Sequence, residues 1–175
     1  SPDGTKIVYT KHSELGVDIY LRDLLSIDPP KLLTSAIGAP SGKPNFSDDG
    51  DWIVYIDNYQ IKRIRVEGGA SQIVSGSDNE HAGIAAVNSS VLFTNASGAL
   101  VRTESNGSSE REILAQESGS VFVWPELLPG SSKALITAAK DRMSIGSTGE
   151  IQLLDLETLE RKTLIETAFN GRYSP

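Results

Sequence analysis

The chain has 175 residues, with 16 Lys and Arg against 23 Asp and Glu, so its formal net charge is −7. That length corresponds to about one domain, and a hydrophobic fraction of 38% is enough for a folded core. The acidic balance argues against binding to nucleic acid or to an anionic membrane surface, because both need clusters of Lys and Arg. Cysteine is absent, which excludes disulfides and thiolate metal sites. No apolar run approaches the roughly 18 residues of a membrane span.

Four segments of the sequence can be aligned with one another, and each has the same order of elements. A short polar turn leads into a run of apolar residues, an alternating run follows, and a last short run ends in Leu, Ile or Val. Short runs rich in β-branched and aromatic residues favour strands. In chain order the repeats comprise residues 1–10, 18–24 and 30–34; 46–57, 60–69 and 71–74; 85–95, 99–107 and 111–114; and 125–138, 150–160 and 161–165.

The turn that opens each repeat has the composition of a tight β-turn. It reads Ser-Pro-Asp-Gly at 1–4, Ser-Asp-Asp-Gly at 47–50 and Leu-Pro-Gly-Ser at 128–131. In such turns Pro presets φ, Asp accepts hydrogen bonds from nearby backbone N–H groups, and Gly tolerates positive φ. Because the acids recur at one turn position, we interpret them as structural and not as a catalytic pair. The predicted structural turn residues are Pro2, Asp3, Gly4, Asp49, Gly50, Pro129 and Gly130.

The repeat spacing, roughly 40–47 residues with three or four strands per unit, is typical of a β-propeller blade. We therefore predict an all-β fold, a β-propeller of four visible blades, each of three to four antiparallel strands. A sandwich is less favoured because it does not repeat its turn chemistry at this period. We expect one propeller region over residues 1–175, with blades at about 1–34, 43–75, 82–115 and 120–166, and residues 168–175 as the inner strand of a further or closing blade.

These motifs resemble the TolB-like, WD-repeat-like β-propeller repeat, whose blades carry a Ser-Pro-Asp-Gly turn between strands one and two. The segments 46–74, 123–138, 150–165 and 171–175, with Trp124-Pro125 ahead of the Leu-Pro-Gly turn, are similar to the propeller region attached to bacterial serine/threonine protein kinases. The resemblance implies a module of a larger bacterial protein in a periplasmic or other extracytoplasmic compartment. Propellers of this family usually have six or more blades, whereas four are visible here. The chain contains no kinase motif.

Catalytic motifs are absent from the sequence. There is no GxSxG elbow, no HExxH and no EF-hand loop, and the two histidines, His12 and His81, are far apart. We therefore predict a protein that is not an enzyme and holds no cofactor and no metal. Residues 62–65 are the only basic run. On a strand, Arg63 and Arg65 would point to one side and Lys62 to the other, which indicates an exposed outer-strand face.

A binding surface is expected on the loops of one propeller face, because loops on a rigid scaffold carry function. The loops between the second and third strands share this face with the loops that enter the inner strands. The longest of them, 140–149, holds the only methionine. Trp124 begins an inner strand, where it either lines the channel or, as we favour, packs between blades. The candidate binding residues are His12, Glu14, Lys43, Asn58, Tyr59, Glu80, His81, Trp124, Lys140, Arg142 and Met143.

The function predicted from the sequence is a non-catalytic β-propeller module that binds a protein or peptide or senses a ligand. The alternative is the propeller domain of a peptidase or other hydrolase, where it gates substrate access. The exposed strand edges left by four blades could be closed within the chain or by a second copy, which would give a homodimeric ring.

Overall fold

The computed structural model describes residues 1–13, 16–36, 43–76, 83–87, 89–116, 120–128, 130–141 and 149–173. Its regular elements are all β-strands, and they form four antiparallel sheets that follow one another along the chain. Blade 1 comprises β1 (Lys6–Ser13), β2 (Gly16–Asp23) and β3 (Lys31–Ala36). Blade 2 comprises β4 (Asn45–Phe46), β5 (Trp52–Asp57), β6 (Gln60–Arg65) and β7 (Gln72–Gly76). Blade 3 comprises β8 (Ile84–Val87), β9 (Ser90–Thr94), β10 (Leu100–Glu104) and β11 (Arg111–Leu114). Blade 4 comprises β12 (Val121–Leu127), β13 (Lys133–Ala139), β14 (Gly149–Asp155) and β15 (Arg161–Ile165).

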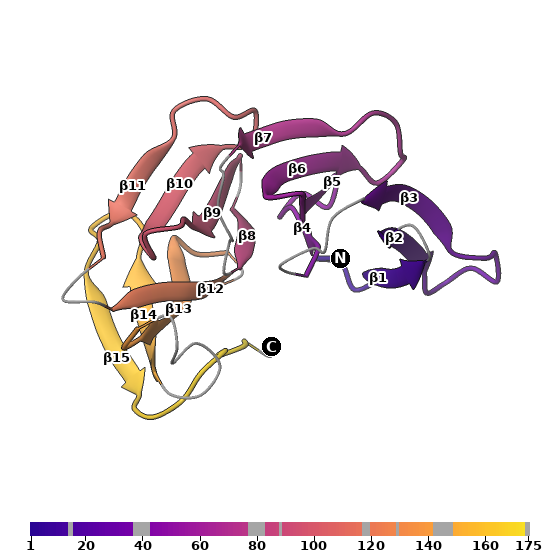
Figure 1. Cartoon of the computed structure of the whole chain (residues 1–175). Coiled ribbons are helices and arrows are strands. Elements are labelled where there is room, and N and C mark those ends of the chain that lie inside the picture. The colour runs from indigo at the N-terminus through magenta and orange to yellow at the C-terminus, as the bar shows by residue number, and fades with distance from the viewer. Residues whose placement is uncertain are drawn as a thin grey trace.

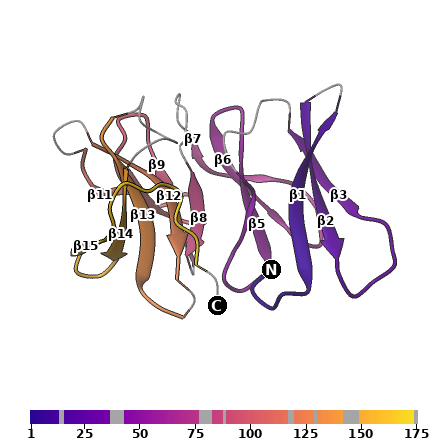
Figure 2. The same ribbon diagram turned by 90° about the horizontal axis from the view of Figure 1, so that it is seen from below.

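The four blades lie side by side in an arc, with β4, β8 and β12 toward the centre and β7, β11 and β15 on the outside (Figure 1). Each blade pairs its strands in chain order, and blade 1 has three strands where the others have four. The prediction of a partial all-β propeller with four blades is thereby confirmed. In the view of Figure 2 the N-terminal turn and the C-terminal end lie at the lower end of the blades.

Apolar side chains on the facing sides of adjacent sheets hold neighbouring blades together. Side chains along a strand alternate between the two faces of the sheet. A strand of blade 2 or blade 3 therefore packs alternate side chains against the blade on either side. Burying one such aliphatic side chain stabilises the fold by about 1.5–3 kcal/mol. Contact clusters join Ile19 and Leu21 to Ile53 and Tyr55 between blades 1 and 2, Val54 and Ile56 to Ala86 and Phe93 between blades 2 and 3, and Leu92 and Leu100 to Ile136 and Leu154 between blades 3 and 4.

The recurring serine turn closes the first hairpin of blade 2 with a fixed set of hydrogen bonds. Ser47 Oγ donates to Asp49 Oδ1 at 2.5 Å and accepts from the backbone N–H of Trp52 at 3.0 Å. The Asp51 backbone N–H donates to the same Asp49 oxygen, and Gly50 has φ 76°. The Ser1–Lys6 turn of blade 1 has the same bonds at its equivalent positions. In blade 4, a serine hydroxyl at position 131 accepts from the Lys133 backbone N–H.

Residues 168–173 differ from the strand expected there, because they form no strand in the described part of the chain. They run across the face of blade 4 that is turned away from blade 3. The Asn170 backbone N–H donates to Thr137 Oγ1 at 3.1 Å, and Arg172 forms an ion pair with Glu126 at 2.5 Å. The rings of Phe169 and Trp124 lie 6.2 Å apart. The segment therefore covers apolar side chains of blade 4 without extending its sheet.

Candidate functional site: a polar cleft on blade 4

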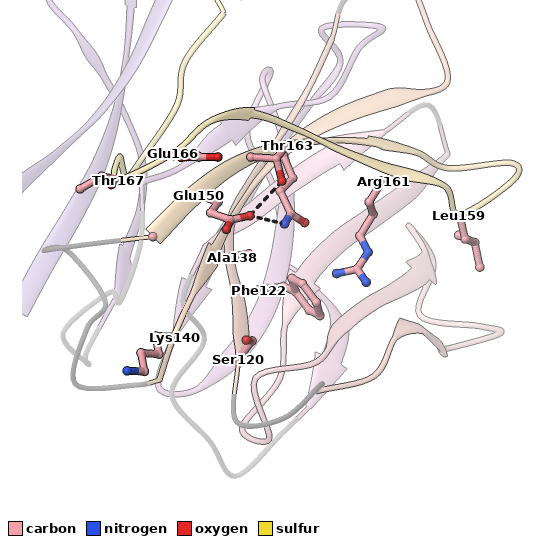
Figure 3. Close-up of a pocket in the computed structure, with 12 residues that line it drawn as sticks. Ser120, Phe122, Ala138, Lys140, Glu150, Leu159, Arg161, Thr163, Glu166 and Thr167 are labelled. Atoms are coloured by element: carbon pink, nitrogen blue, oxygen red, sulfur yellow. Dashed lines mark hydrogen bonds between the residues drawn. The ribbon is translucent and has the colours of Figure 1, made fainter.

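A cleft with a volume of about 880 Å³ lies on the sheet of blade 4 (Figure 3). The strand register places Gln152 opposite Ile136 and Thr163 opposite Gln152, so these side chains share the face that packs against blade 3. The cleft begins where the apolar contact with blade 3 ends. Its lining residues are Ser120, Phe122, Ala138, Lys140, Gly149, Glu150, Gln152, Leu159, Arg161, Thr163, Glu166 and Thr167.

Glu150 stands at the centre of the polar lining and is held by two neutral donors. Gln152 Nε2 donates to Glu150 Oε2 at 3.0 Å, and Thr163 Oγ1 donates to the same oxygen at 2.9 Å. These hydrogen bonds hold the pKa of Glu150 below its usual value, Gln152 contributing more than Thr163. The carboxylate is therefore ionised at neutral pH and has a fixed orientation.

Two cationic side chains lie on opposite sides of this carboxylate in the view of Figure 3, Arg161 and Lys140. The Arg161 guanidinium carbon is 5.1 Å from the ring centroid of Phe122, a distance at which a cation is attracted to an aromatic face. Lys140 follows the last residue of β13 and is exposed. The cleft therefore offers both signs of charge, and its apolar contribution is limited to Phe122, Ala138 and Leu159.

Among the candidate binding residues that the structure describes, Lys140 alone lines this cleft. Asn58 and Tyr59 form the two-residue turn between β5 and β6, with φ values of 48° and 63°. His12 is exposed near the end of β1, and Lys43 is exposed ahead of β4. These residues are spread over three blades, and their role in binding stays a prediction.

Trp124 is half-buried and lies in a β-bulge of β12, with a positive φ of 50°. Its side chain packs beside Val121 and Val123 and against Phe169 of the C-terminal segment. Gly83 of blade 3 approaches its backbone so closely that an added Cβ would lie 2.8 Å from the Trp124 Cα. Trp124 thus packs on the face of blade 4 that is turned away from blade 3, and its role in binding stays a prediction. The remaining predicted residues, Glu14, Glu80, His81, Pro129, Arg142 and Met143, lie outside the described residues.

The prediction of an exposed face for the basic run at 62–65 fits Arg65, which is exposed, but not Arg63. Arg63 and Arg65 do share one side of β6, with guanidinium carbons 4.1 and 4.4 Å from the Trp52 ring centroid. However, β6 is the third strand of four, and Arg63 is half-buried between blades 2 and 3, where Nη1 donates to Ser105 Oγ at 2.9 Å. Stacking on an aromatic ring and bonding across a blade boundary make Arg63 part of the packing. Burial lowers its pKa, and the charge of Arg65 adds to that effect.

The cleft residues Glu150, Gln152, Arg161 and Thr163 were not predicted from the sequence. The signal that could have indicated two of them is the alternation Glu150-Ile-Gln152-Leu in a strand whose two faces should both be apolar. Within the described residues, no three His, Asp or Glu side chains are placed to share a metal ion. The same residues contain no helix long and apolar enough to cross a membrane.

Comparison with solved structures places the fold among β-propellers. A protein assigned as TolB in Agrobacterium tumefaciens matches with a TM-score of 0.79 at 18% identity, over 97% of this chain and 66% of that one. A chain of the nidogen/laminin complex gives 0.69 at 14% identity over 92% and 61%, and the Cps50 (Swd1) β-propeller domain of Myceliophteria thermophila gives 0.68 at 9% over 95% and 54%. This chain thus spans less than two thirds of each. Neither a protein-family model nor a curated protein sequence matches it.

Proposed function

We propose that this chain is a non-catalytic β-propeller module that binds an extended segment of a partner protein in the blade 4 cleft. The observation that carries the proposal is the cleft itself, whose volume of about 880 Å³ falls in the range of ligand sites. Such sites are usually lined by apolar and aromatic side chains. Here the lining is mostly polar and carries both signs of charge, which suits a peptide better than a lipid or another apolar ligand.

The carboxyl groups support a binding role over a catalytic one. A general acid or base works best when its pKa lies near the operating pH. In the described part of the chain, each carboxyl group with a resolved shift has its pKa lowered by hydrogen bonds, and these groups are Asp3, Asp49, Glu150 and Asp155. They are permanent acceptors at neutral pH. Turnover of peptide substrates by this chain would contradict the proposal and favour a hydrolase.

The exposed face of blade 1 supports a place in a larger assembly. Ile7 is 47% exposed and Tyr9 is half-buried, whereas their equivalents in blade 2, Ile53 and Tyr55, are at most 2% exposed because blade 1 covers them. We infer that a further blade covers this face, within a longer protein or from a second copy. Light scattering separates the two sources, since a particle of 18.8 kDa excludes the second copy and twice that mass supports it.

The test of the binding role is a selection from a random peptide display library, followed by affinity measurements on cleft variants. Arg161→Glu reverses a charge in the cleft, while Lys162→Glu makes the same change on the adjacent residue, which pairs with Leu153 on the opposite face of the sheet. Charge reversal inside an interface costs several kcal/mol, so we expect selected peptides to bind Arg161→Glu at least tenfold more weakly and Lys162→Glu as tightly as wild type.

Glu166→Lys, at an exposed position of the rim, provides a second variant that does not depend on the Phe122 contact. Thermal unfolding of each variant checks that the fold is retained. The proposal is overturned if the library yields no peptide that prefers this chain to an unrelated protein. It is also overturned if well-folded Arg161→Glu and Glu166→Lys bind the selected peptides like wild type.

A further inference from the structure

Glu150 lines the cleft and has no cationic partner among the described residues, unlike Asp155 and Glu126 of the same blade. Asp155 lies 3.9 Å from Lys133, and Glu126 lies 2.5 Å from Arg172. The partners of Glu150 are the neutral Gln152 and Thr163, and both bond to the oxygen Oε2. A carboxylate offers about four lone-pair positions on its two oxygens. The Oε1 oxygen of Glu150 is therefore available to a donor that enters the cleft.

A second acceptor stands beside it. The side-chain oxygen Oε1 of Gln152 is buried and has no hydrogen-bond partner in the described part of the chain. A buried acceptor without a donor is unfavourable, and each such group in a folded protein calls for an explanation. Glu150 and Gln152 are two residues apart on β14, so their side chains extend from the same face of the sheet. Because Gln152 Oε1 has almost no accessible surface, it is the Glu150 carboxylate that meets a group entering the cleft, with the unpartnered oxygen directly beside it.

A group that bonds to the carboxylate of Glu150 must present N–H donors, and a positive charge on that group strengthens the bond. A guanidinium has five N–H donors and an ammonium has three, and neither accepts hydrogen bonds. Resting on the binding role proposed above, we infer that the cleft recognises a Lys or Arg side chain of the bound segment at Glu150. The flanking cations Arg161 and Lys140 disfavour further basic residues beside it. The recognised feature is a single basic residue, in contrast to a polybasic run.

The inference is tested by a double-mutant cycle between the chain and a peptide selected on it. Glu150→Gln removes the charge and keeps an amide that can still bond to Thr163. The matched control is Glu160→Gln, an exposed residue of the same blade in the β14–β15 turn. The peptide is measured with its basic residue and with Gln in that position. Hydrogen bonds to charged groups are stronger than neutral ones, so we expect the peptide change to weaken binding about tenfold on wild type and on Glu160→Gln, and less than twofold on Glu150→Gln.

The result that overturns the inference is a selected peptide set without a common Lys or Arg, or an equal loss on wild type and on Glu150→Gln. In either case peptides still bind, and the proposed function stands. If the library yields no binder, the proposed function fails, and a small probe then decides the inference separately. N-acetyl-arginine methylamide titrated into isotope-labelled chain must shift the backbone amide signals of Glu150 and Gln152 more than N-acetyl-citrulline methylamide does. Equal or absent shifts overturn it.

Discussion

Replacing Gly98 by alanine is expected to weaken the contact between blades 3 and 4 by a measurable amount. Gly98 lies in the turn between β9 and β10 with φ 87°, and its carbonyl accepts a hydrogen bond from the Phe122 backbone N–H at 2.9 Å. An added Cβ would lie 2.3 Å from Cγ1 of Val121. An L-residue with left-handed φ costs about 1 kcal/mol or more, and overpacking adds about 1–3 kcal/mol. The inter-blade hydrogen bond, if broken, costs about 1 kcal/mol.

The lower entropy of the unfolded alanine chain offsets about 0.4–1 kcal/mol of this. The net loss expected for Gly98→Ala is therefore about 2–4 kcal/mol in the free energy of unfolding. Gly130→Ala is the matched control, because Gly130 also has positive φ, at 66°, but no atom lies within 4 Å of the added Cβ. Its expected cost is about 1 kcal/mol or less. The assay is urea denaturation followed by the fluorescence of the two tryptophans, Trp52 in blade 2 and Trp124 in blade 4. Equal losses for the two variants would refute the steric argument.

Three further predictions concern local hydrogen bonds and strain. The bonds from Ser47 and Asp51 lower the pKa of Asp49. The carboxylate therefore contributes its full stabilisation above the unfolded pKa of about 3.8 and loses it as the pH falls through the lower folded pKa. Between about pH 6 and pH 3 the urea midpoint of Asp49→Asn should drop less than that of wild type, and an equal drop contradicts this. Tyr59→Gly should raise the unfolding free energy by about 0.5–1 kcal/mol, because glycine relieves the positive φ of an exposed tyrosine at a two-residue hairpin turn. If urea denaturation shows no gain in unfolding free energy, the turn is unstrained and the prediction is wrong. Thr94→Val removes a buried hydrogen bond of 2.5 Å to a backbone carbonyl of blade 4 and should cost about 1–2 kcal/mol, whereas a loss under 0.5 kcal/mol in the same assay contradicts the contact.

The fold was predictable because its determinants are local and repeated. The Ser-Asp-Asp-Gly turn holds its own bonds within six residues, between Ser47 and Trp52. The strands that follow the turn carry short apolar runs, most of them β-branched or aromatic, at matching places in each repeat, so the propeller follows from turn chemistry and strand propensity together. The segment 161–165 was predicted as the last strand of its repeat for the same reason, and it pairs with β14.

The cleft could not be predicted, because it depends on how far blade 3 covers the sheet of blade 4. Gln152 and Leu154 lie on the same face of β14, yet Leu154 is fully buried against blade 3 and Gln152 lines the cleft. The strand pattern alone does not locate the boundary between them. The same limit applies to Arg63. Alternation placed it on the correct side of β6, but a strand pattern does not show the inter-blade packing that half-buries it.

The most direct test of the central claim is to map a selected peptide on the isotope-labelled chain by NMR. A binding module that uses the blade 4 cleft predicts amide shift changes at Phe122, Glu150, Gln152, Arg161 and Thr163, which line it from three strands. Turn residues at the other end of the blades should be unaffected. The account is contradicted if the amide signals of these five residues do not shift and the shift changes instead occur on blades 1 and 2.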